Sequence, residues 1–175
     1  PPGLEGTSVP LQLSALGVPG VNHIVTSIMM PVAEPGDAGQ AFEQAFGHPD
    51  GTAGSLPLPG LEYEYALQQL PTFQLTWRTL GQDAFSLGGL AGWDDEVAIG
   101  LDELRRISHP TMLVWPANDP FGDVDLGREI ARHLPDGRLH VAGVGHLPWL
   151  DDPEGIAELV AGFLADGFAG GSGRD

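Results

Sequence analysis

The chain has 175 residues and a formal net charge of −17, which comes from 24 acidic side chains and 7 basic ones, all arginine. Such a negative surface repels phosphate backbones and anionic lipids, which argues against a nucleic-acid partner and against a membrane partner. Cysteine is absent, so the chain has no disulfides, thiolate nucleophiles or cysteine-based metal sites.

The first 60 residues are rich in glycine and proline and show little periodicity. Their longest uncharged run, residues 6–33, has the length of a membrane span, but three prolines interrupt it and we do not interpret it as one. We expect a helix over residues 37–46, where apolar side chains share one face and Gly47 follows as a C-cap. Residues 48–60 contain three glycines and three prolines and are expected to form a loop.

Residues 61–106 are predicted to be mainly helical. Apolar residues recur at helical spacing over residues 61–70 and again over 73–80, with Pro71 between the two helices. A loop is expected over residues 81–92. A further helix is expected over residues 94–106, where Val97, Leu101 and Leu104 are the apolar positions.

The pattern changes after residue 107 to strand, helix, strand and helix. The apolar run Thr111–Trp115 lies between two prolines and predicts a strand that is buried on both faces. The expected elements that follow are a helix over 123–134, a strand over 138–142, a helix over 153–168 that Asp151 or Asp152 caps, and a flexible tail over 169–175.

This order predicts two parallel strands joined by a right-handed crossover. Two strands cannot close an α/β domain by themselves, because both faces and both edges of the sheet need cover. The chain is therefore expected to be the last part of a larger α/β domain. Its first residue is Pro1 rather than Met, which we take as a sign of processing or of a fragment.

Two side chains with catalytic chemistry follow the two predicted strands. Asp119 comes after the first strand and His146 after the second, 27 positions later. The carboxyl ends of neighbouring parallel strands meet at one edge of a sheet, which is where open α/β sheets carry their functional groups. A carboxylate beside an imidazole fixes its tautomer and stabilises the imidazolium that forms when the ring takes a proton.

At these residues the sequence resembles the C-terminal third of an α/β-hydrolase. The resemblance covers residues 107–165 and rests on the strand that ends near Asp119, the run Gly143-Val-Gly-His146, the turn Asp151-Asp-Pro-Glu154 and the closing helix. It implies a partial α/β-hydrolase fold with a helical lid over residues 1–106 and an α/β segment over 107–168. It also implies Asp119 as the triad acid and His146 as the general base in cofactor-free hydrolysis of an ester, an amide or a similar small apolar substrate.

The resemblance places the nucleophile before the lid, and therefore outside this chain. One substitute is Ser86, in the run Ala84-Phe-Ser86-Leu-Gly-Gly. A nucleophile elbow needs a buried strand before it, and Gly81-Gln-Asp83 is poor strand material, so we interpret Ser86 as part of a lid loop. The isolated chain is expected to be inactive.

Other polar clusters are weaker candidates. Asp94-Asp-Glu96 and Asp151-Asp152 are more typical of acidic helix starts than of a metal site, and we expect no metal and no cofactor. Asp123 is a reserve for the triad acid. The remaining histidines are expected to be structural or to lie in lid loops, where a substrate-side role has no support: His23, His48, His109, His133 and His140. Trp77 and Trp93 are expected to pack in a core more than to line an apolar substrate pocket.

Three expectations concern the surroundings of the protein. The partners of a hydrolase would be a small-molecule substrate and a separate N-terminal hydrolase segment. The alternative is a non-enzymatic binding domain or an inactive remnant, whose exposed sheet edges favour a homodimer. No signal peptide opens the chain and we expect a cytoplasmic location. The acidic, lysine-free composition fits either adaptation to high salt or a coding bias.

Overall fold

A computed structural model describes residues 3–28, 34–55, 58–70, 72–85 and 92–170. Ser86 and residues 171–175 of the expected tail lie outside these ranges. The elements are, in chain order, α1 (Leu11–Ser14), the 3-10 helix η1 (Ala15–Gly17), α2 (Val21–Ile28), α3 (Pro35–Phe46), α4 (Thr52–Ser55), α5 (Leu58–Gln68), α6 (Phe73–Ala84), α7 (Leu101–Leu104), β1 (Thr111–Trp115), α8 (Val124–His133), β2 (Gly137–Val141), α9 (Pro148–Asp151) and α10 (Pro153–Gly170).

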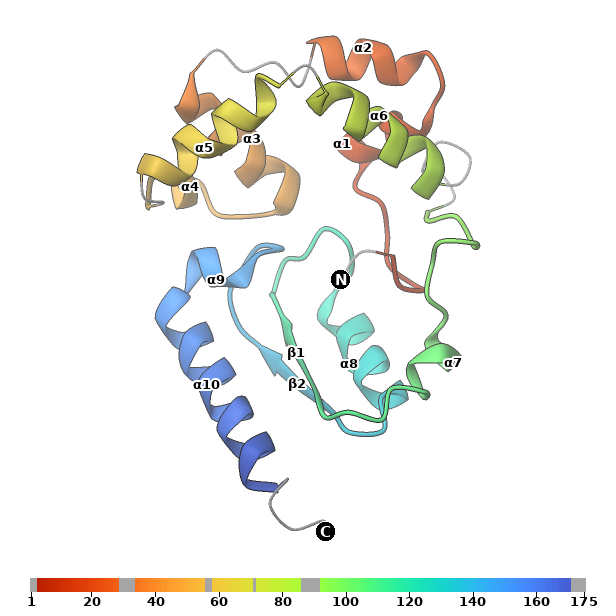
Figure 1. The fold of residues 1–175 in the computed structure, drawn as a ribbon, viewed down its shortest axis with the longest axis vertical. Coiled ribbons are helices and arrows are strands. Elements are labelled where there is room, and N and C mark those ends of the chain that lie inside the picture. The colour runs from red at the N-terminus through yellow and green to blue at the C-terminus, as the bar shows by residue number, and fades with distance from the viewer. Residues whose placement is uncertain (1–2, 29–33, 56–57, 71, 86–91, 171–175) are drawn as a thin grey trace.

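The second half of the chain forms a small α/β layer. Strands β1 and β2 pair in parallel, from Thr111 opposite Gly137 to Trp115 opposite Val141. Helix α8 connects them and packs against one face of the sheet, while α10 runs along the other side (Figure 1). The predicted parallel pair with a helical crossover is confirmed.

The core of this layer lies between the sheet and α8. It contains Trp115 and Ile130, both almost fully buried, together with Leu104 and Leu134 from the chain before β1 and after α8. The indole N–H of Trp115 donates to the carbonyl of Gly122 at 3.0 Å, so this large ring is satisfied inside the core. The apolar side chains of the helix predicted over residues 123–134, Leu126, Ile130 and Leu134, thus pack against the sheet.

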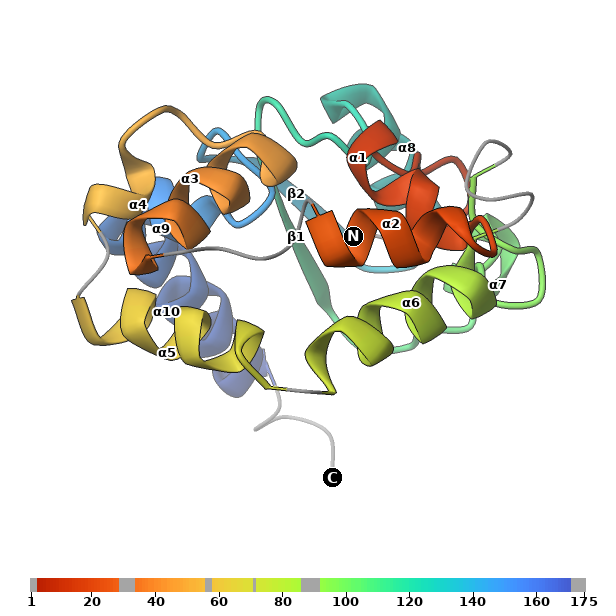
Figure 2. The same ribbon diagram turned by 90° about the horizontal axis from the view of Figure 1, so that it is seen from above.

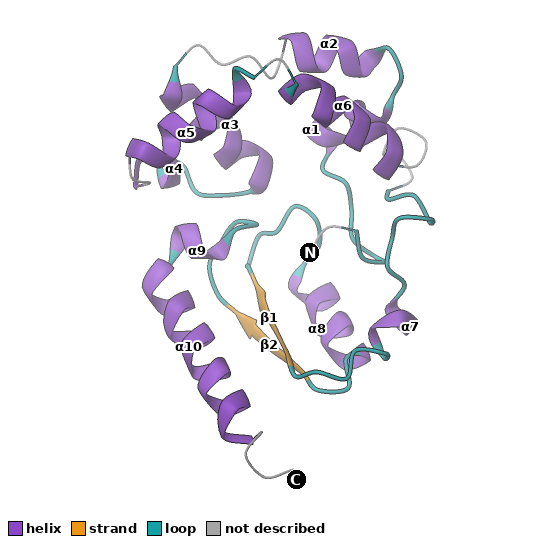
Figure 3. Ribbon diagram, in the orientation of Figure 1, coloured by secondary structure: helices purple, strands orange, loops and turns teal. Residues whose placement is uncertain are grey.

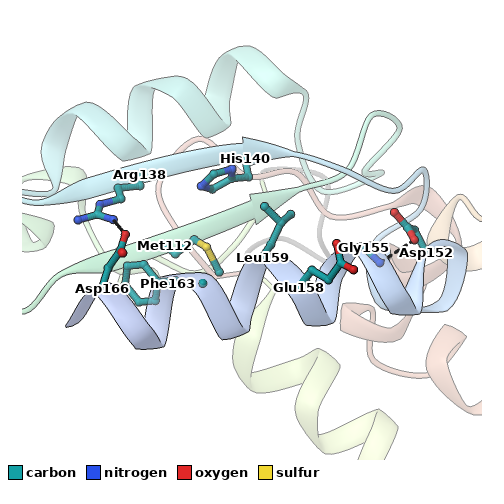
Figure 4. A pocket seen from close by; sticks show the side chains of 10 residues that line it. Met112, Arg138, His140, Asp152, Gly155, Glu158, Leu159, Phe163 and Asp166 are labelled. Atoms are coloured by element: carbon teal, nitrogen blue, oxygen red, sulfur yellow. Dashed lines mark hydrogen bonds and ion pairs between the residues drawn. The ribbon is translucent and has the colours of Figure 1, made fainter. Parts of the chain in front are cut away.

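The prediction that the first strand is buried on both faces is wrong. Only Trp115 is buried, and the other four residues of β1 are intermediate. Within the described residues β1 pairs only with β2, and its other edge carries no strand. On the far face, a groove of about 670 Å³ separates Met112 and His140 of the strands from Leu159 and Phe163 of α10 (Figure 4). The ion pair of Arg138 with Asp166, at 3.2 Å, spans this groove.

The first half of the chain is helical and forms two groups that lie over the carboxyl ends of the strands (Figures 1 and 2). Its first helices, α1, η1 and α2, lie in a segment for which the sequence pattern predicted no helix. Helices α1, α2 and α6 pack around η1, with a core of Leu16, Val25, Ala84 and Phe85. Helices α3, α4 and α5 form the second group. Figure 3 shows that strands occur only in the lower layer of the described structure.

Several predicted boundaries need correction. Residues 48–60 are not a continuous loop, because α4 lies within them and α5 begins at Leu58; Pro59 is tolerated in its first turn, where a missing N–H costs nothing. Helix α6 runs to Ala84, into the loop expected from residue 81. Helix α10 runs to Gly170, so the expected tail does not begin at residue 169.

The helix expected over residues 94–106 is reduced to α7. Residue Ile99 instead bridges to the N-terminal segment: its N–H donates to the carbonyl of Gly3 at 2.8 Å, and its carbonyl accepts from Glu5 at 2.9 Å. These bonds hold residue 99 extended, and the helix begins only after Gly100. A long-range contact has therefore overridden the local periodicity.

No helix among the described residues combines the length and the apolar character needed to cross a bilayer. The uncharged run that begins at residue 6 is divided among α1, η1 and α2.

Candidate active site

Asp119 lies in the loop after β1, and this loop is bonded to the loop after β2. The N–H groups of Ala117 and Asn118 donate to the carbonyls of Gly143 and Val144, at 3.2 and 2.8 Å. One carboxylate oxygen of Asp119 accepts the N–H of Phe121 at 2.9 Å, which fixes the side chain against its own loop. The side chain is only 3% exposed, so this acid is held almost completely out of solvent.

His146 lies in the loop after β2, and its imidazole faces Asp119. The Nδ1 atom is 3.0 Å from Oδ1 and 2.9 Å from Oδ2 of that carboxylate. The imidazole side chain is 13% exposed. The structure thus brings together the two residues that the sequence singled out, because parallel pairing places the ends of β1 and β2 side by side.

Two phenylalanines enclose the imidazole. Phe121 lies 4.4 Å from the His146 ring between centroids, and Phe46 stacks on it at 5.7 Å with an interplanar angle of 22°. Phe46 belongs to α3 and its carbonyl also accepts the backbone N–H of His146 at 2.8 Å. The apolar surroundings exclude water from the pair and strengthen its electrostatic contact.

The geometry fixes the chemistry available to His146. A carboxylate accepts hydrogen bonds, so Nδ1 carries the proton and Nε2 keeps its lone pair. No hydrogen bond to Nε2 is made within the described part of the chain. An imidazole with one nitrogen on a carboxylate and the other unbonded is an arrangement that can accept a proton.

A groove of about 250 Å³ leads to this pair along β1. Its lining consists of residues 112–116, Asp119 and residues 146–149. The larger groove beneath α10 contains neither Asp119 nor His146, so we locate the candidate active site in the smaller one.

A second histidine–carboxylate pair lies beside the first, between His48 and Asp151. Nδ1 of His48 is 2.9 Å from Oδ1 of Asp151, and the two side chains are 0% and 8% exposed. The other oxygen of Asp151 accepts the N–H groups of Val144 and Gly145, each at 2.8 Å. Burial opposes ionisation of this acid, but the hydrogen bonds from His48 and from the two N–H groups outweigh it and lower the pKa of Asp151.

Sequence reasoning missed this second pair. Either Asp151 or Asp152 was expected to cap the last helix, and Asp152 does so by accepting the N–H of Gly155 at 2.9 Å. His48 was left without a supported function, because nothing within its own segment indicates a partner 103 residues away. The one available signal was the acidic doublet Asp151-Asp152, since a helix needs only one N-cap.

The other candidates lie away from the site or have structural contacts. Asp123, the reserve acid, caps α8 by accepting the N–H of Leu126 at 2.9 Å. Trp77 and Trp93 are partly buried against the core of the first helical group, as the core interpretation predicted. Helix α6 ends at Ala84, and Phe85, directly before Ser86, forms only an isolated antiparallel bridge with Trp93 and not a strand. Within the described ranges, no three acidic or histidine side chains gather as metal ligands would.

Comparison with known proteins finds relatives for part of the chain. A 2-hydroxy-6-oxononadienedioate/2-hydroxy-6-oxononatrienedioate hydrolase of a Pseudomonas species is 35% identical over 63 residues, which are 35% of this chain and 22% of that protein. The uncharacterized hydrolase YugF of Bacillus subtilis is 30% identical over 64 residues, 36% of this chain and 23% of that protein. A putative non-heme bromoperoxidase, BpoC, of Mycobacterium tuberculosis is 35% identical over 66 residues, 37% of this chain and 25% of that protein.

All three relatives are members of the α/β-hydrolase superfamily. The aligned part of the chain spans at most a quarter of the length of these relatives. No family model matches the chain.

Proposed function

Because part of this chain is related to the α/β-hydrolases, we propose that it supplies the acid and the base of a hydrolase active site. Asp119 is the acid, His146 is the general base, and the nucleophile belongs to a segment outside this chain. The observation that carries the proposal is the pair of contacts of 2.9 and 3.0 Å between His146 Nδ1 and the Asp119 carboxylate.

The proposed reaction uses both nitrogens of His146. Nε2 removes the proton of the nucleophile as it attacks the substrate carbonyl, and Asp119 stabilises the imidazolium that forms. The same proton then passes to the leaving alcohol or amine as its bond to the acyl carbon breaks. Water repeats the sequence on the acyl-enzyme and releases the acid. These proton and acyl transfers proceed without a cofactor.

The shape of the site supports a nucleophile that arrives from outside the chain. The groove is lined by β1, whose second edge has no partner among the described residues, and by Asp119 and His146. Further strands that pair with this edge would complete the sheet and carry the nucleophile toward Nε2. In this proposal residues 107–168 are the catalytic segment and residues 1–106 are the lid. The apolar side chains that line the groove, among them Leu113, Val114 and Trp149, favour a small apolar acyl group.

The test is ester hydrolysis by the product of the complete reading frame that encodes this chain. We expect hydrolysis of a 4-nitrophenyl ester, with His146→Ala and Asp119→Asn each close to background. His109→Ala is the matched control, because His109 is an exposed histidine that precedes β1, away from the site. Activity that survives in both site variants contradicts the proposal.

The isolated chain gives a second test of where the nucleophile lies. A fluorophosphonate probe forms a covalent bond with an activated serine. Residues 1–175 alone should not be labelled, whereas the complete product should be. Labelling of the isolated chain that disappears in Ser86→Ala would assign the nucleophile to this chain.

A second candidate is a non-enzymatic interaction domain that forms a homodimer. The observation in its favour is half-exposed apolar surface in the α/β layer, at Val141, Trp149 and Leu164. Sedimentation of the isolated chain separates the two candidates. A stable dimer without fluorophosphonate labelling of the complete product would favour interaction over catalysis.

A further inference from the structure

One short turn of the helical region contacts both loops of the candidate active site. This turn, Phe46-Gly47-His48, ends α3 and lies over the carboxyl ends of the strands (Figure 1). The first of its residues accepts the backbone N–H of His146 and stacks on its ring. Gly47 contacts the loop after β1, which carries Asp119 and is called the acid loop. His48 contacts the loop after β2, which carries His146 and is called the base loop.

Gly47 makes the approach to the acid loop possible. Its φ of +70° is in the left-handed region, which ends α3 and turns the chain toward the site. A Cβ atom at this position would lie 2.6 Å from the carbonyl oxygen of Asn118 and 3.2 Å from Pro120. The backbone of the turn therefore packs directly against the residues that flank Asp119.

His48 makes the approach to the base loop. Its ring packs so closely on Gly145 that a Cβ atom there would lie 2.5 Å from ring atoms. Nε2 accepts the N–H of Leu147 at 3.3 Å, so the ring proton resides on Nδ1, which donates to Asp151 at 2.9 Å. Both polar atoms of a fully buried imidazole are thus committed to the segment that carries His146.

Asp151 links His48 to the backbone that precedes His146. One of its oxygens accepts the N–H groups of Val144 and Gly145, and the other faces His48 and, at 3.4 Å, the hydroxyl of Thr52. The backbone is therefore held before His146 by Asp151 and after it by His48. A backbone fixed on both sides leaves the imidazole little freedom to turn from Asp119.

We infer that His48 is a positioning residue, which holds the loop of residues 144–147 through Asp151 so that Nδ1 of His146 stays on Asp119. The inference rests on the proposed function. His48 has no contact with a reacting atom, and its effect passes through the loop. The helical region thereby sets the geometry of a base that the α/β layer carries.

The test follows the His146 Nδ1 proton by NMR in the chain labelled uniformly with ¹⁵N. A carboxylate-bound imidazole N–H gives a low-field signal, which Asp119→Asn identifies by removing it. His48→Asn keeps a donor at the position of Nδ1, whereas His48→Phe keeps the ring volume without polar atoms. His109→Ala is the control, and the amide signals of β1 and β2 report whether each variant is folded.

We expect exchange of the His146 proton with water to quicken about tenfold in His48→Phe, and to stay within about twofold of the wild type in His48→Asn and His109→Ala. A wild-type rate in His48→Phe overturns the inference, as does an equal increase in the Asn and Phe variants, since the donor to Asp151 that Asn retains would then give no protection. His48→Ala replaces the Phe variant if the latter does not fold.

The two proposals fail in different ways. If Asp119→Asn leaves the low-field signal of the wild type unchanged, the acid–base pair itself is wrong, and the proposed function fails with it. If Asp119→Asn removes the signal and His48→Phe does not alter it, only the role of His48 is wrong.

Discussion

The α/β layer and the helical region of this protein are built in different ways. The layer is one continuous unit, in which two paired strands and α8 share a core around Trp115 and Ile130. The helical region is divided into two groups, one of which packs around Leu16. The layer carries Asp119 and His146, whereas the helical region supplies Phe46 and His48 around them.

The boundary between the two regions contains many hydrogen bonds. Ser8 donates its N–H to the carbonyl of Phe121 at 2.7 Å and its hydroxyl to that of Pro120 at 2.9 Å. Nδ1 of His48, in the helical region, lies 2.9 Å from Oδ1 of Asp151 in the layer. Such directional contacts fix the relative position of two surfaces more strictly than apolar contacts do. The comparison thus separates residues that carry chemistry from residues that position it.

The largest expected effect tests whether the layer carries the chemistry. If the proposed function holds, Asp119→Asn in the product of the complete reading frame should lower kcat about 10⁴-fold, because an amide no longer fixes the tautomer of His146 or stabilises its imidazolium. The measurement is ester hydrolysis under saturating substrate. Asp123→Asn, which removes only the cap of α8, should change kcat by less than about threefold. Equal losses in the two variants would contradict the assignment of Asp119.

The next effect tests how closely the helical region docks on the layer. Gly47→Ala should lower the free energy of unfolding by about 2 to 4 kcal/mol, since it combines a strained φ with a clash against Asn118. Gly51→Ala is a matched control, because Gly51 has a φ of +91° but open space around its Cβ position. It should cost only about 1 to 2 kcal/mol. Chemical denaturation measures both, and equal costs would mean that the docking contact is weak.

A smaller effect is expected from Asp151, and it depends on pH. The pKa of Asp151 is lowered in the folded protein, so its stabilisation is present above the ordinary carboxyl pKa of 3.8 and is lost as the pH falls through the folded-state value. Asp151→Asn should therefore cost about 2 kcal/mol at pH 7, and the difference from the wild type should shrink below about pH 4. Denaturation curves at several pH values measure this, and a difference that stays constant down to pH 2 would refute the linkage.

The smallest effect concerns the net charge of −17, which both regions share. If the acidic surface is an adaptation to high salt, raising KCl from about 0.1 to 2 M should raise Tm by roughly 5 °C, because screening relieves self-repulsion. A triple variant, Asp50→Asn, Glu62→Gln and Asp95→Asn, removes three exposed charges and should show a smaller rise. A flat or falling Tm in the wild type would favour coding bias as the source of the acidity.

The sequence predicted the α/β layer better than the helical region. The apolar run at Thr111–Trp115 and the stripe over residues 123–134 are strong local patterns, and the strand and helix lie where these patterns placed them. Residues 94–106 also have helical spacing, yet bridging of Ile99 to the N-terminal segment left only α7. Local periodicity decides an element only where no distant partner competes for the same backbone groups.

The sequence alone determined the acidic surface, the two strands and the polar residues that follow each of them. These features depend on composition and short-range pattern, and parallel pairing then requires Asp119 and His146 to approach one another. Only the tertiary structure decided that His48 and Asp151 form a second pair, and that Phe46 closes over the imidazole. The physical reason is that docking two regions creates contacts between residues about 100 positions apart, and each partner of such a contact looks ordinary within its own segment.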